Sequence, residues 1–258
     1  MLDGFTRTEF HHDGLTRVVY RAGTGPAVIV MPEMPGLHPP VLEFARRVVD
    51  IGRTVYLPSL FGTPGRPNSP GYLAGTLLRA CLAREFTVFA TGRTSPIASW
   101  LRALAARAHQ ECGGPGVGAV GMCFTGGFAL AMMVDERMLA PVLSQPSLPA
   151  PFGRRRRAAV GVAAADLARI ADRVRNGACA IGLRYTHDRA VPPERFETLR
   201  RALGDGFLPV ELDSSPGNPY GIPQRAHAVL TGDLGDRPDH PARQALDQVL
   251  AFLRDRLE

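Results

Sequence analysis

Residues 121–127, which read Gly-Met-Cys-Phe-Thr-Gly-Gly, constrain the fold more than any other stretch. An apolar run at residues 117–120 leads into them, and a helix-forming run at residues 128–133 leads out. This pattern predicts a sharp turn from a strand to a helix, with Cys123 at its tip and small residues where a side chain would crowd it. Such a turn exposes a nucleophile above a sheet, beside the N–H groups of a helix N-terminus.

The 258 residues fit one large domain, so we expect a single domain over residues 1–258. Hydrophobic residues make up 45% and charged residues 21%, as in ordinary globular proteins. The net charge of +6 comes from scattered arginines that are not interleaved with aromatic residues, so we predict no nucleic-acid partner. No apolar stretch is long enough to span a membrane, and no signal peptide is evident, so we predict no membrane association and a cytoplasmic location.

The four cysteines show neither a C-x-x-C spacing nor a histidine pattern typical of zinc sites, so we predict no metal site. Without a secretion signal, reduced thiols are expected. Cys81, Cys112 and Cys179 are predicted to be small buried hydrophobic side chains. The glycines around Cys123 set that residue apart as a candidate nucleophile.

Strand patterns alternate with helix patterns along the chain. Strands are predicted at residues 5–10, 16–22, 27–31, 54–57, 117–120, 141–144, 179–185 and 208–212. Helices are predicted at residues 39–51, 73–84, 95–111, 128–133, 166–175, 193–203 and 242–257. The alternation predicts the α/β class, with a mostly parallel, doubly wound sheet flanked by helices.

Reactive side chains follow several of the predicted strands. Glu33 follows the strand at 27–31, Cys123 follows the strand at 117–120, and Asp188 follows the strand at 179–185. His227 lies in the long polar loop after the last strand. Because the carboxyl ends of parallel strands meet at one edge, we expect these groups to lie together. Their chain order of nucleophile, acid and base is the order of α/β-hydrolases.

These side chains suit attack on a carbonyl group. A thiolate attacks the carbon, a histidine takes and later returns the proton, and an aspartate fixes the tautomer of that histidine. The developing oxyanion needs two N–H donors. We predict the backbone N–H groups of Phe124, directly after the cysteine, and of Met34, in the turn after the strand at 27–31.

Several motifs resemble the dienelactone hydrolase family over most of the chain. Residues 29–36 are similar to its strand, glutamate and oxyanion turn, and residues 57–62 to its next strand end. Residues 121–127 resemble its G-x-C-x-G-G elbow, residues 188–192 its acid followed by Val-Pro, and Ala226-His227 its histidine loop. The Cys elbow is the most specific of these motifs.

The resemblance implies the α/β-hydrolase fold and a Cys123, His227 and Asp188 triad. It implies that Glu33 lies near the thiol and helps to control its ionisation. It further implies hydrolysis of small lactones or carboxylic esters, as in carboxymethylenebutenolidase, without cofactor or metal. We expect a small-molecule ester or lactone as the substrate and a monomer or homodimer as the assembly.

The chain departs from the family pattern at several positions. Thr125 and Ser59 stand where the family usually has Gly and Asp, and residues 228–231 lack its substrate-binding arginine. The candidates for an anion-binding role are Arg79, Arg84, Arg184 and Arg189, and no motif selects one. The departures concern the substrate rather than the hydrolytic chemistry.

Other interpretations of these residues stay open. His187 is a rival base and Asp213 a rival acid. Residues 116–121 match G-x-G-x-x-G, but they fall before and along a strand rather than between a strand and a helix, which argues against a dinucleotide site. The arginine run at 154–157 is predicted to be a solvated loop. The alternative function is that of a non-catalytic relative, acting as a binding protein or a thiol-redox-responsive protein.

Overall fold

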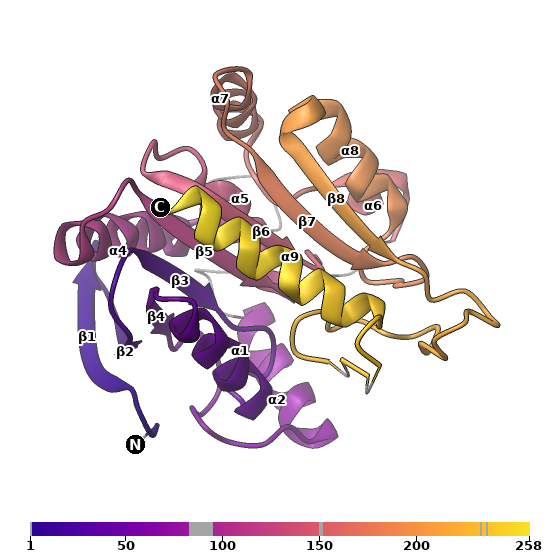
Figure 1. The fold of residues 1–258 in the computed structure, drawn as a ribbon, viewed down its shortest axis with the longest axis horizontal. Helices are drawn as coiled ribbons and strands as arrows, with labels where there is room; N and C mark the ends of the chain where they lie inside the picture. The colour runs from indigo at the N-terminus through magenta and orange to yellow at the C-terminus, as the bar shows by residue number, and fades with distance from the viewer. Residues whose placement is uncertain (1, 83–94, 150–151, 233, 236) are drawn as a thin grey trace.

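The computed structural model describes residues 2–82, 95–149, 152–232, 234–235 and 237–258. Within these residues, eight strands form one sheet in the order β1-β2-β4-β3-β5-β6-β7-β8 (Figure 1). The strands are β1 (Thr6–His12), β2 (Leu15–Ala22), β3 (Ala27–Met31), β4 (Thr54–Pro58), β5 (Val117–Met122), β6 (Met138–Ser144), β7 (Ala180–Tyr185) and β8 (Phe207–Leu212). The strands β1, β2 and β4 pair antiparallel, and every pair from β4 through β3 to β8 is parallel. The predicted mostly parallel sheet is therefore confirmed.

The helices alternate with the strands, as the sequence pattern predicts. They are α1 (Pro39–Asp50), α2 (Pro70–Leu82), α4 (Pro96–Cys112), α5 (Gly126–Met132), α6 (Arg154–Ala158), α7 (Ala164–Arg175), α8 (Pro193–Leu203) and α9 (Pro241–Arg256), with short 3-10 turns η2 (Cys123–Thr125) and η3 (Gly204–Gly206). The arginine run at 154–157, predicted as a loop, instead begins α6, whose residues are exposed or half-buried. The predicted end of α2 at residue 84 lies outside the described residues. None of the described helices is long and apolar enough to cross a membrane.

Helix α4 shows how local sequence fixes an element. Ser95 caps its first turn by accepting a hydrogen bond from the N–H of Ala98 at 3.3 Å, and Pro96 opens the helix with a backbone angle already suited to it. One face buries Trp100, Leu101 and neighbouring apolar side chains. Gly113 then ends the helix in the left-handed region, with φ of 66°.

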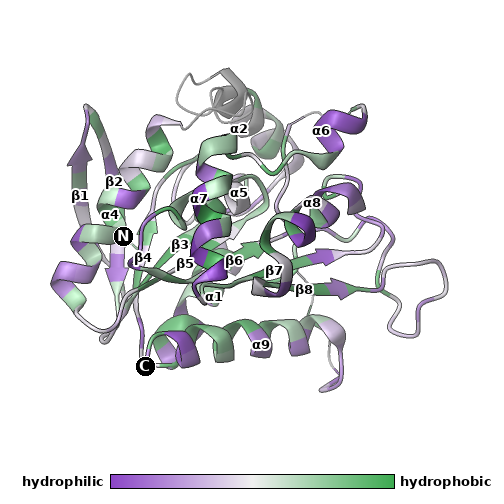
Figure 2. Cartoon of the chain, turned by 90° about the horizontal axis from the view of Figure 1, so that it is seen from above, coloured by the Kyte–Doolittle hydropathy of each residue, from purple (hydrophilic) through white to green (hydrophobic). Residues whose placement is uncertain are grey.

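The core lies on both faces of the sheet. In β3, Ile29 and Met31 pack with side chains of α4 and α5, whereas Val28 and Val30 pack with side chains of α1 and α9. Figure 2 shows α9 on one side of the sheet and α5, α7 and α8 on the other. This double cover explains why β3 is an unbroken apolar run, since neither of its faces meets water.

The strand register brings the predicted site residues to one edge. Met31 pairs with Gly121, Met122 with Ser144, and Tyr185 with Leu212, so β3, β5, β6, β7 and β8 end beside one another. The segments that carry Glu33, Cys123 and Asp188 therefore leave the sheet at the same edge.

Candidate active site

Cys123 lies at the tip of a tight turn between β5 and α5. Its φ of 55° falls in the left-handed region, which non-glycine residues seldom occupy. A Cβ atom at Gly121 would collide with the carbonyl of Thr125, and one at Gly126 would lie 2.7 Å from Cβ of Pro146. These two glycines are thus required by close backbone approach, and the predicted strand-to-helix turn is formed.

Thr125 has a structural role in the same turn. Its hydroxyl accepts a hydrogen bond from the N–H of Met122 at 2.8 Å and lies 3.1 Å from the carbonyl oxygen of Met31. The hydroxyl therefore links the ends of β3 and β5. This bridge explains how the elbow tolerates a threonine where the family pattern has glycine, because the tight contacts fall at Gly121 and Gly126 instead.

The structure brings His227 and Asp188 together across the edge of the sheet. Nδ1 of His227 lies 2.6 Å from Oδ2 of Asp188, and Oδ1 of the buried carboxylate accepts a hydrogen bond from the N–H of Ala190 at 2.9 Å. Asp188 sits in the turn after β7, and His227 comes from the loop between β8 and α9. The carboxylate thereby fixes the orientation of the imidazole ring.

The imidazole of His227 also interacts with Cys123. Burial lowers the pKa of His227, but hydrogen bonds to Asp188 and to Cys123 raise it, and the net result is a pKa of about 11. The charged imidazolium is thus favoured at neutral pH. An imidazolium beside a thiol is the arrangement that favours a thiolate.

Glu33 has partners other than the thiol. Its buried carboxylate accepts hydrogen bonds from Nε2 of Gln145 at 2.9 Å and from the hydroxyl of Thr231, and Nε2 of His38 lies 3.3 Å from Oε1. Among the residues that the structure describes, no hydrogen bond or ion pair joins Glu33 to Cys123. The structure places Glu33 in a network with the histidine loop, and its influence on the thiol stays a prediction.

Two residues at this edge were missed by sequence analysis. The hydroxyl of Ser147 lies 3.0 Å from Sγ of Cys123, and the side chain of Gln145 connects Glu33 to the N–H of Val229, which lies 3.3 Å from its Oε1. Both residues follow β6, so a search of every strand end for hydroxyls and amides, besides titratable groups, would have found them.

The two predicted oxyanion donors lie on segments that leave neighbouring strands. Met34 belongs to the turn after β3, which is closed by a 2.8 Å hydrogen bond from the N–H of Gly36 to the carbonyl of Glu33. Phe124 lies in η2, with its ring edge-to-face against those of Phe61 and Phe128. Their role as donors stays a prediction.

The rival base and acid have local partners. The exposed His187 has its Nδ1 3.2 Å from the hydroxyl of Thr186, and Asp213 accepts a 2.8 Å hydrogen bond from the N–H of Ser215 within its own turn. The partner of Asp188 is His227. This placement favours His227 as the base and Asp188 as the acid.

The structure separates the four candidate arginines. Arg184 is buried and lies 2.7 Å from both Oε1 of Glu211 and the carbonyl of Val191, so it serves the fold. Arg84 and the side chain of Arg79 lie outside the described residues. Arg189 is exposed and lines a cavity of about 470 Å³. The lining residues are His187, Asp188, Arg189, Ala190, Gln224, Arg225 and His227.

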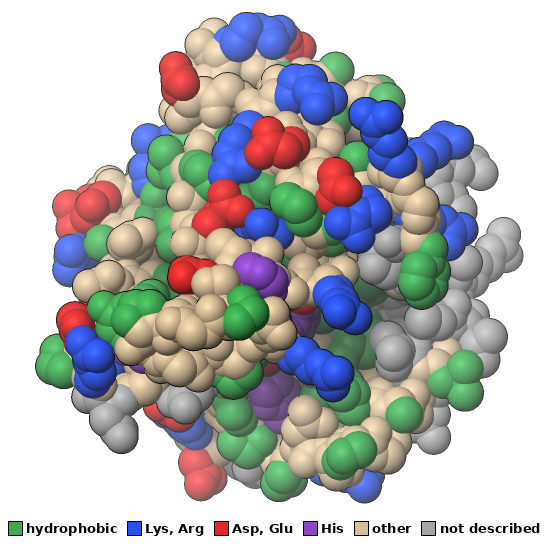
Figure 3. Space-filling view, turned by 90° about the vertical axis from the view of Figure 1, so that its right-hand side faces the viewer, with side chains coloured by type: hydrophobic (Ala, Val, Ile, Leu, Met, Phe, Trp, Pro, Cys, Tyr) green, Lys and Arg blue, Asp and Glu red, His purple; other side chains and the backbone are tan. Residues whose placement is uncertain are grey.

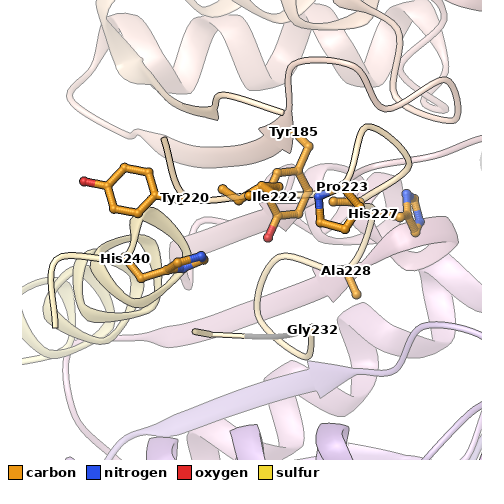
Figure 4. A pocket seen from close by; sticks show the side chains of 10 residues that line it. Tyr185, Tyr220, Ile222, Pro223, His227, Ala228, Gly232 and His240 are labelled. Carbon is orange, nitrogen blue, oxygen red and sulfur yellow. The ribbon is translucent and has the colours of Figure 1, made fainter. Parts of the chain in front are cut away.

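The cavity opens on the face that carries the loops after β7 and β8. Figure 3 shows histidine side chains on that face between positively charged ones, which are arginines because the sequence contains no lysine. A second cavity of about 310 Å³ is also lined by residues of the loop that carries His227. In Figure 4, His227 marks one end of this cavity, and Tyr220 and His240 mark the other. His227 lines both cavities.

A cysteine on a strand-to-helix elbow, with a histidine and an aspartate at the carboxyl edge of a mostly parallel sheet, is typical of the α/β-hydrolase class. Within that class, the chain belongs to the dienelactone hydrolase family, whose sequence model matches residues 16–218. His227 lies beyond the matched residues. No curated protein sequence matches the chain.

Solved structures share the fold. A putative dienelactone hydrolase from Klebsiella pneumoniae has a TM-score of 0.60 at 19% identity, covering 96% of this chain and 97% of that one. A dienelactone hydrolase-like promiscuous phosphotriesterase from metagenomic libraries has a TM-score of 0.63 at 20% identity, covering 98% of both chains. A dienelactone hydrolase from Anabaena variabilis has a TM-score of 0.62 at 12% identity, with the same coverage. At these identities, the likeness shows the α/β-hydrolase fold.

Proposed function

We propose that this protein hydrolyses small carboxylic esters or lactones through a Cys123, His227 and Asp188 triad. The observation that carries the proposal is the 2.6 Å contact between Nδ1 of His227 and Oδ2 of Asp188, at the same edge of the sheet as Cys123. The electrostatic interaction of the same imidazole with Cys123 supports it. Family membership supports hydrolysis as the reaction type. The position of Cys123 at the elbow supports that residue as the nucleophile.

The reaction would proceed in two halves. In the resting pair, the proton of the Cys123 thiol has passed to His227. The thiolate sulfur attacks the carbonyl carbon, and the carbonyl π electrons move onto the oxygen. Collapse of this intermediate breaks the bond to the alcohol oxygen, which takes the proton from His227 and leaves a thioester. Water then attacks the thioester with His227 as the base, and the sulfur leaves with the acid product released. N–H groups of Met34 and Phe124 would stabilise the oxyanion in both halves.

The surroundings of His227 support a small substrate with a negatively charged group. Arg189 and Arg225 line the 470 Å³ cavity together with His227, and neither is paired with a carboxylate of the described chain. A volume of this order suits a small molecule. The two guanidinium groups can attract a carboxylate on such a substrate.

The proposed function is consistent with the predicted location and the predicted assembly of the protein. An activated thiol stays reduced in the cytoplasm, which remains the predicted location. A monomer or homodimer remains the predicted assembly, because each chain carries the whole proposed triad.

A panel of esters and lactones, assayed with the wild type and Cys123→Ala, tests the proposal. We expect kcat to fall on the order of 10³-fold or more in Cys123→Ala. The matched control is Cys179→Ala, which removes a half-buried free thiol just before β7 and should keep the activity. Full activity in Cys123→Ala would refute the proposal. An inert panel with a thiol that oxidises readily would instead favour the thiol-redox alternative.

A further inference from the structure

The sulfur of Cys123 has a hydroxyl partner that lies outside the triad. Oγ of Ser147 is 3.0 Å from Sγ, and the backbone N–H of Ser147 donates a second hydrogen bond, also 3.0 Å long, to the carbonyl of Cys123. Ser147 is only 9% exposed. Ser147 therefore contacts Cys123, the residue at the tip of the elbow, through both its backbone N–H and its side-chain hydroxyl.

The segment that carries Ser147 is held from two sides. Pro146 packs on Gly126, where a Cβ atom would lie 2.7 Å from the proline ring. On the other side, Nη1 of the buried Arg195 donates to the carbonyl of Pro146 at 2.8 Å and to that of Ala190 at 3.0 Å. One guanidinium from α8 thus fixes the serine segment and the turn of the acid together.

Arg195 keeps this role at neutral pH. Burial lowers its pKa to about 10, which still leaves the guanidinium charged. Its Nε also donates to the carbonyl of Ala159 at 2.6 Å. Because Arg195 holds the segment, the Ser147 hydroxyl is positioned in advance. Little reorganisation is then needed when negative charge develops on the Cys123 sulfur next to it.

We propose that Ser147 is a further catalytic residue, whose hydroxyl donates a hydrogen bond to the Cys123 thiolate in the resting enzyme. The inference rests on the proposed function, in which Cys123 is the nucleophile. With a proton on His227, the sulfur is an acceptor and the hydroxyl of Ser147 is the available donor at 3.0 Å. Glu33 cannot fill this place, because a carboxylate would repel a thiolate and its oxygens are engaged elsewhere.

The hydrogen bond acts on the ionisation of the thiol. A donor to the charged form of an acid favours that form, so the hydroxyl enlarges the fraction of reactive thiolate. When the sulfur forms its bond to the carbonyl carbon, it loses its negative charge and the hydrogen bond weakens. The hydroxyl keeps its own proton throughout and takes no part in the covalent steps.

The test measures the alkylation rate of Cys123 by iodoacetamide as a function of pH, by mass spectrometry of the peptide that contains Cys123. We expect the pH midpoint to rise by about 1 unit in Ser147→Ala. We expect kcat/KM at neutral pH to fall about 10-fold, and Ser147→Thr, which keeps a hydroxyl, to recover most of both losses. The control is Ser95→Ala, which removes a buried serine that only caps α4 and should leave the midpoint unchanged.

The inference is overturned if a folded Ser147→Ala keeps the wild-type midpoint. If Ser147→Ala does not fold, Ser147→Gly removes the hydroxyl while keeping the N–H that binds the Cys123 carbonyl, and its midpoint decides in the same way. Alkylation needs no substrate, so the two proposals fail differently. Full activity of Cys123→Ala overturns the proposed function, whereas a dead Cys123→Ala with an unshifted Ser147→Ala overturns only the role of Ser147.

Discussion

Nε2 of Gln145 donates a 2.9 Å hydrogen bond to Oε2 of Glu33, so the segment after β6 holds the carboxylate that follows β3. Oε1 of the same glutamine accepts a hydrogen bond from the N–H of Val229, and the hydroxyl of Thr231 donates a hydrogen bond to Glu33. Val229 and Thr231 lie just after His227, so this buried network anchors the loop that presents the imidazole. Glu33 therefore has a structural reason to be a buried carboxylate that does not involve the thiol.

The network predicts that Glu33→Gln lowers the stability of the fold and has little effect on the reactivity of the Cys123 thiol. Loss of the charge removes charge-assisted hydrogen bonds, and we expect the free energy of unfolding to fall by about 1–3 kcal/mol. The pH midpoint of Cys123 alkylation should stay as in the wild type. Urea unfolding and alkylation of the same preparation check both halves. A shifted midpoint with unchanged stability would restore the expectation that Glu33 controls the thiol.

Asp188→Asn should preserve the fold and remove most of the activity. The amide cannot hold the imidazole in the same tautomer or stabilise its cation, and we expect kcat to fall on the order of 10⁴-fold. Steady-state hydrolysis of the best ester of the panel measures the loss. Asp213→Asn changes an exposed carboxylate in a neighbouring loop and should stay near wild-type activity. The reverse ranking of the two variants would make Asp213 the acid.

The raised pKa of His227 predicts how stability changes with pH. The folded pKa of about 11 lies above the unfolded value of about 6.5, so the stabilising contribution is complete below pH 6.5 and is lost as the pH rises towards 11. In the upper part of that window, above the free-thiol pKa of about 8.5, the wild type should lose stability relative to His227→Gln by up to about 1.4 kcal/mol per pH unit. Unfolding curves of both proteins from pH 6 to about pH 10 measure the difference. A constant difference across the window would contradict the prediction.

Arg189→Gln and Arg225→Gln should weaken binding of anionic esters selectively. Each removes one positive charge from the cavity beside His227, and we expect KM for a carboxylate-bearing ester to rise about 5- to 10-fold, with kcat little changed. KM for a neutral ester of the same size should stay constant. Arg201→Gln, which changes an exposed arginine of α8, serves as the control. An equal effect on the neutral ester would exclude charge recognition.

Gly126→Ala should destabilise the protein, whereas Gly75→Ala should not. The added methyl group at residue 126 would meet Pro146, and the resulting shift should cost about 1–3 kcal/mol. Gly75 lies within α2 with open space around it, so alanine there should stabilise the helix by about 0.5–1 kcal/mol. Thermal unfolding of the two variants checks the contrast. A neutral Gly126→Ala would show that the elbow can yield at that point.

The sequence predicts most of the fold because its signals are local. The unbroken apolar run of β3, the glycines around Cys123 and the proline and serine that open α4 each specify an element without reference to distant residues. The parallel topology follows from the alternation of such elements. Only the short helix at the arginine run departs from the predicted order within the described chain, since its solvated residues carry no apolar periodicity.

The partners of the site residues depend on distant contacts, and there the sequence is less informative. Glu33 contacts Gln145 and Thr231, which are 112 and 198 positions away along the chain, and no local pattern marks those pairs. The contact of Cys123 with Ser147 likewise arises only because β5 and β6 are neighbours. Chain order predicts which strand ends meet, but only the packed structure shows which side chains touch.

The loop between β8 and α9 is held by hydrogen bonds at residues 229–231, after His227, and has cavity-lining residues before it. Residues 229–231 are tied to Gln145 and Glu33, whereas Tyr220, Gln224 and Arg225 precede His227 and line the two cavities. The hydrogen bonds that anchor this loop to Gln145 and Glu33 therefore follow the imidazole along the chain, whereas these three cavity-lining residues precede it. Substitutions at Tyr220, Gln224 and Arg225 should therefore change the lining of the two cavities while leaving the hydrogen bonds that anchor the loop in place.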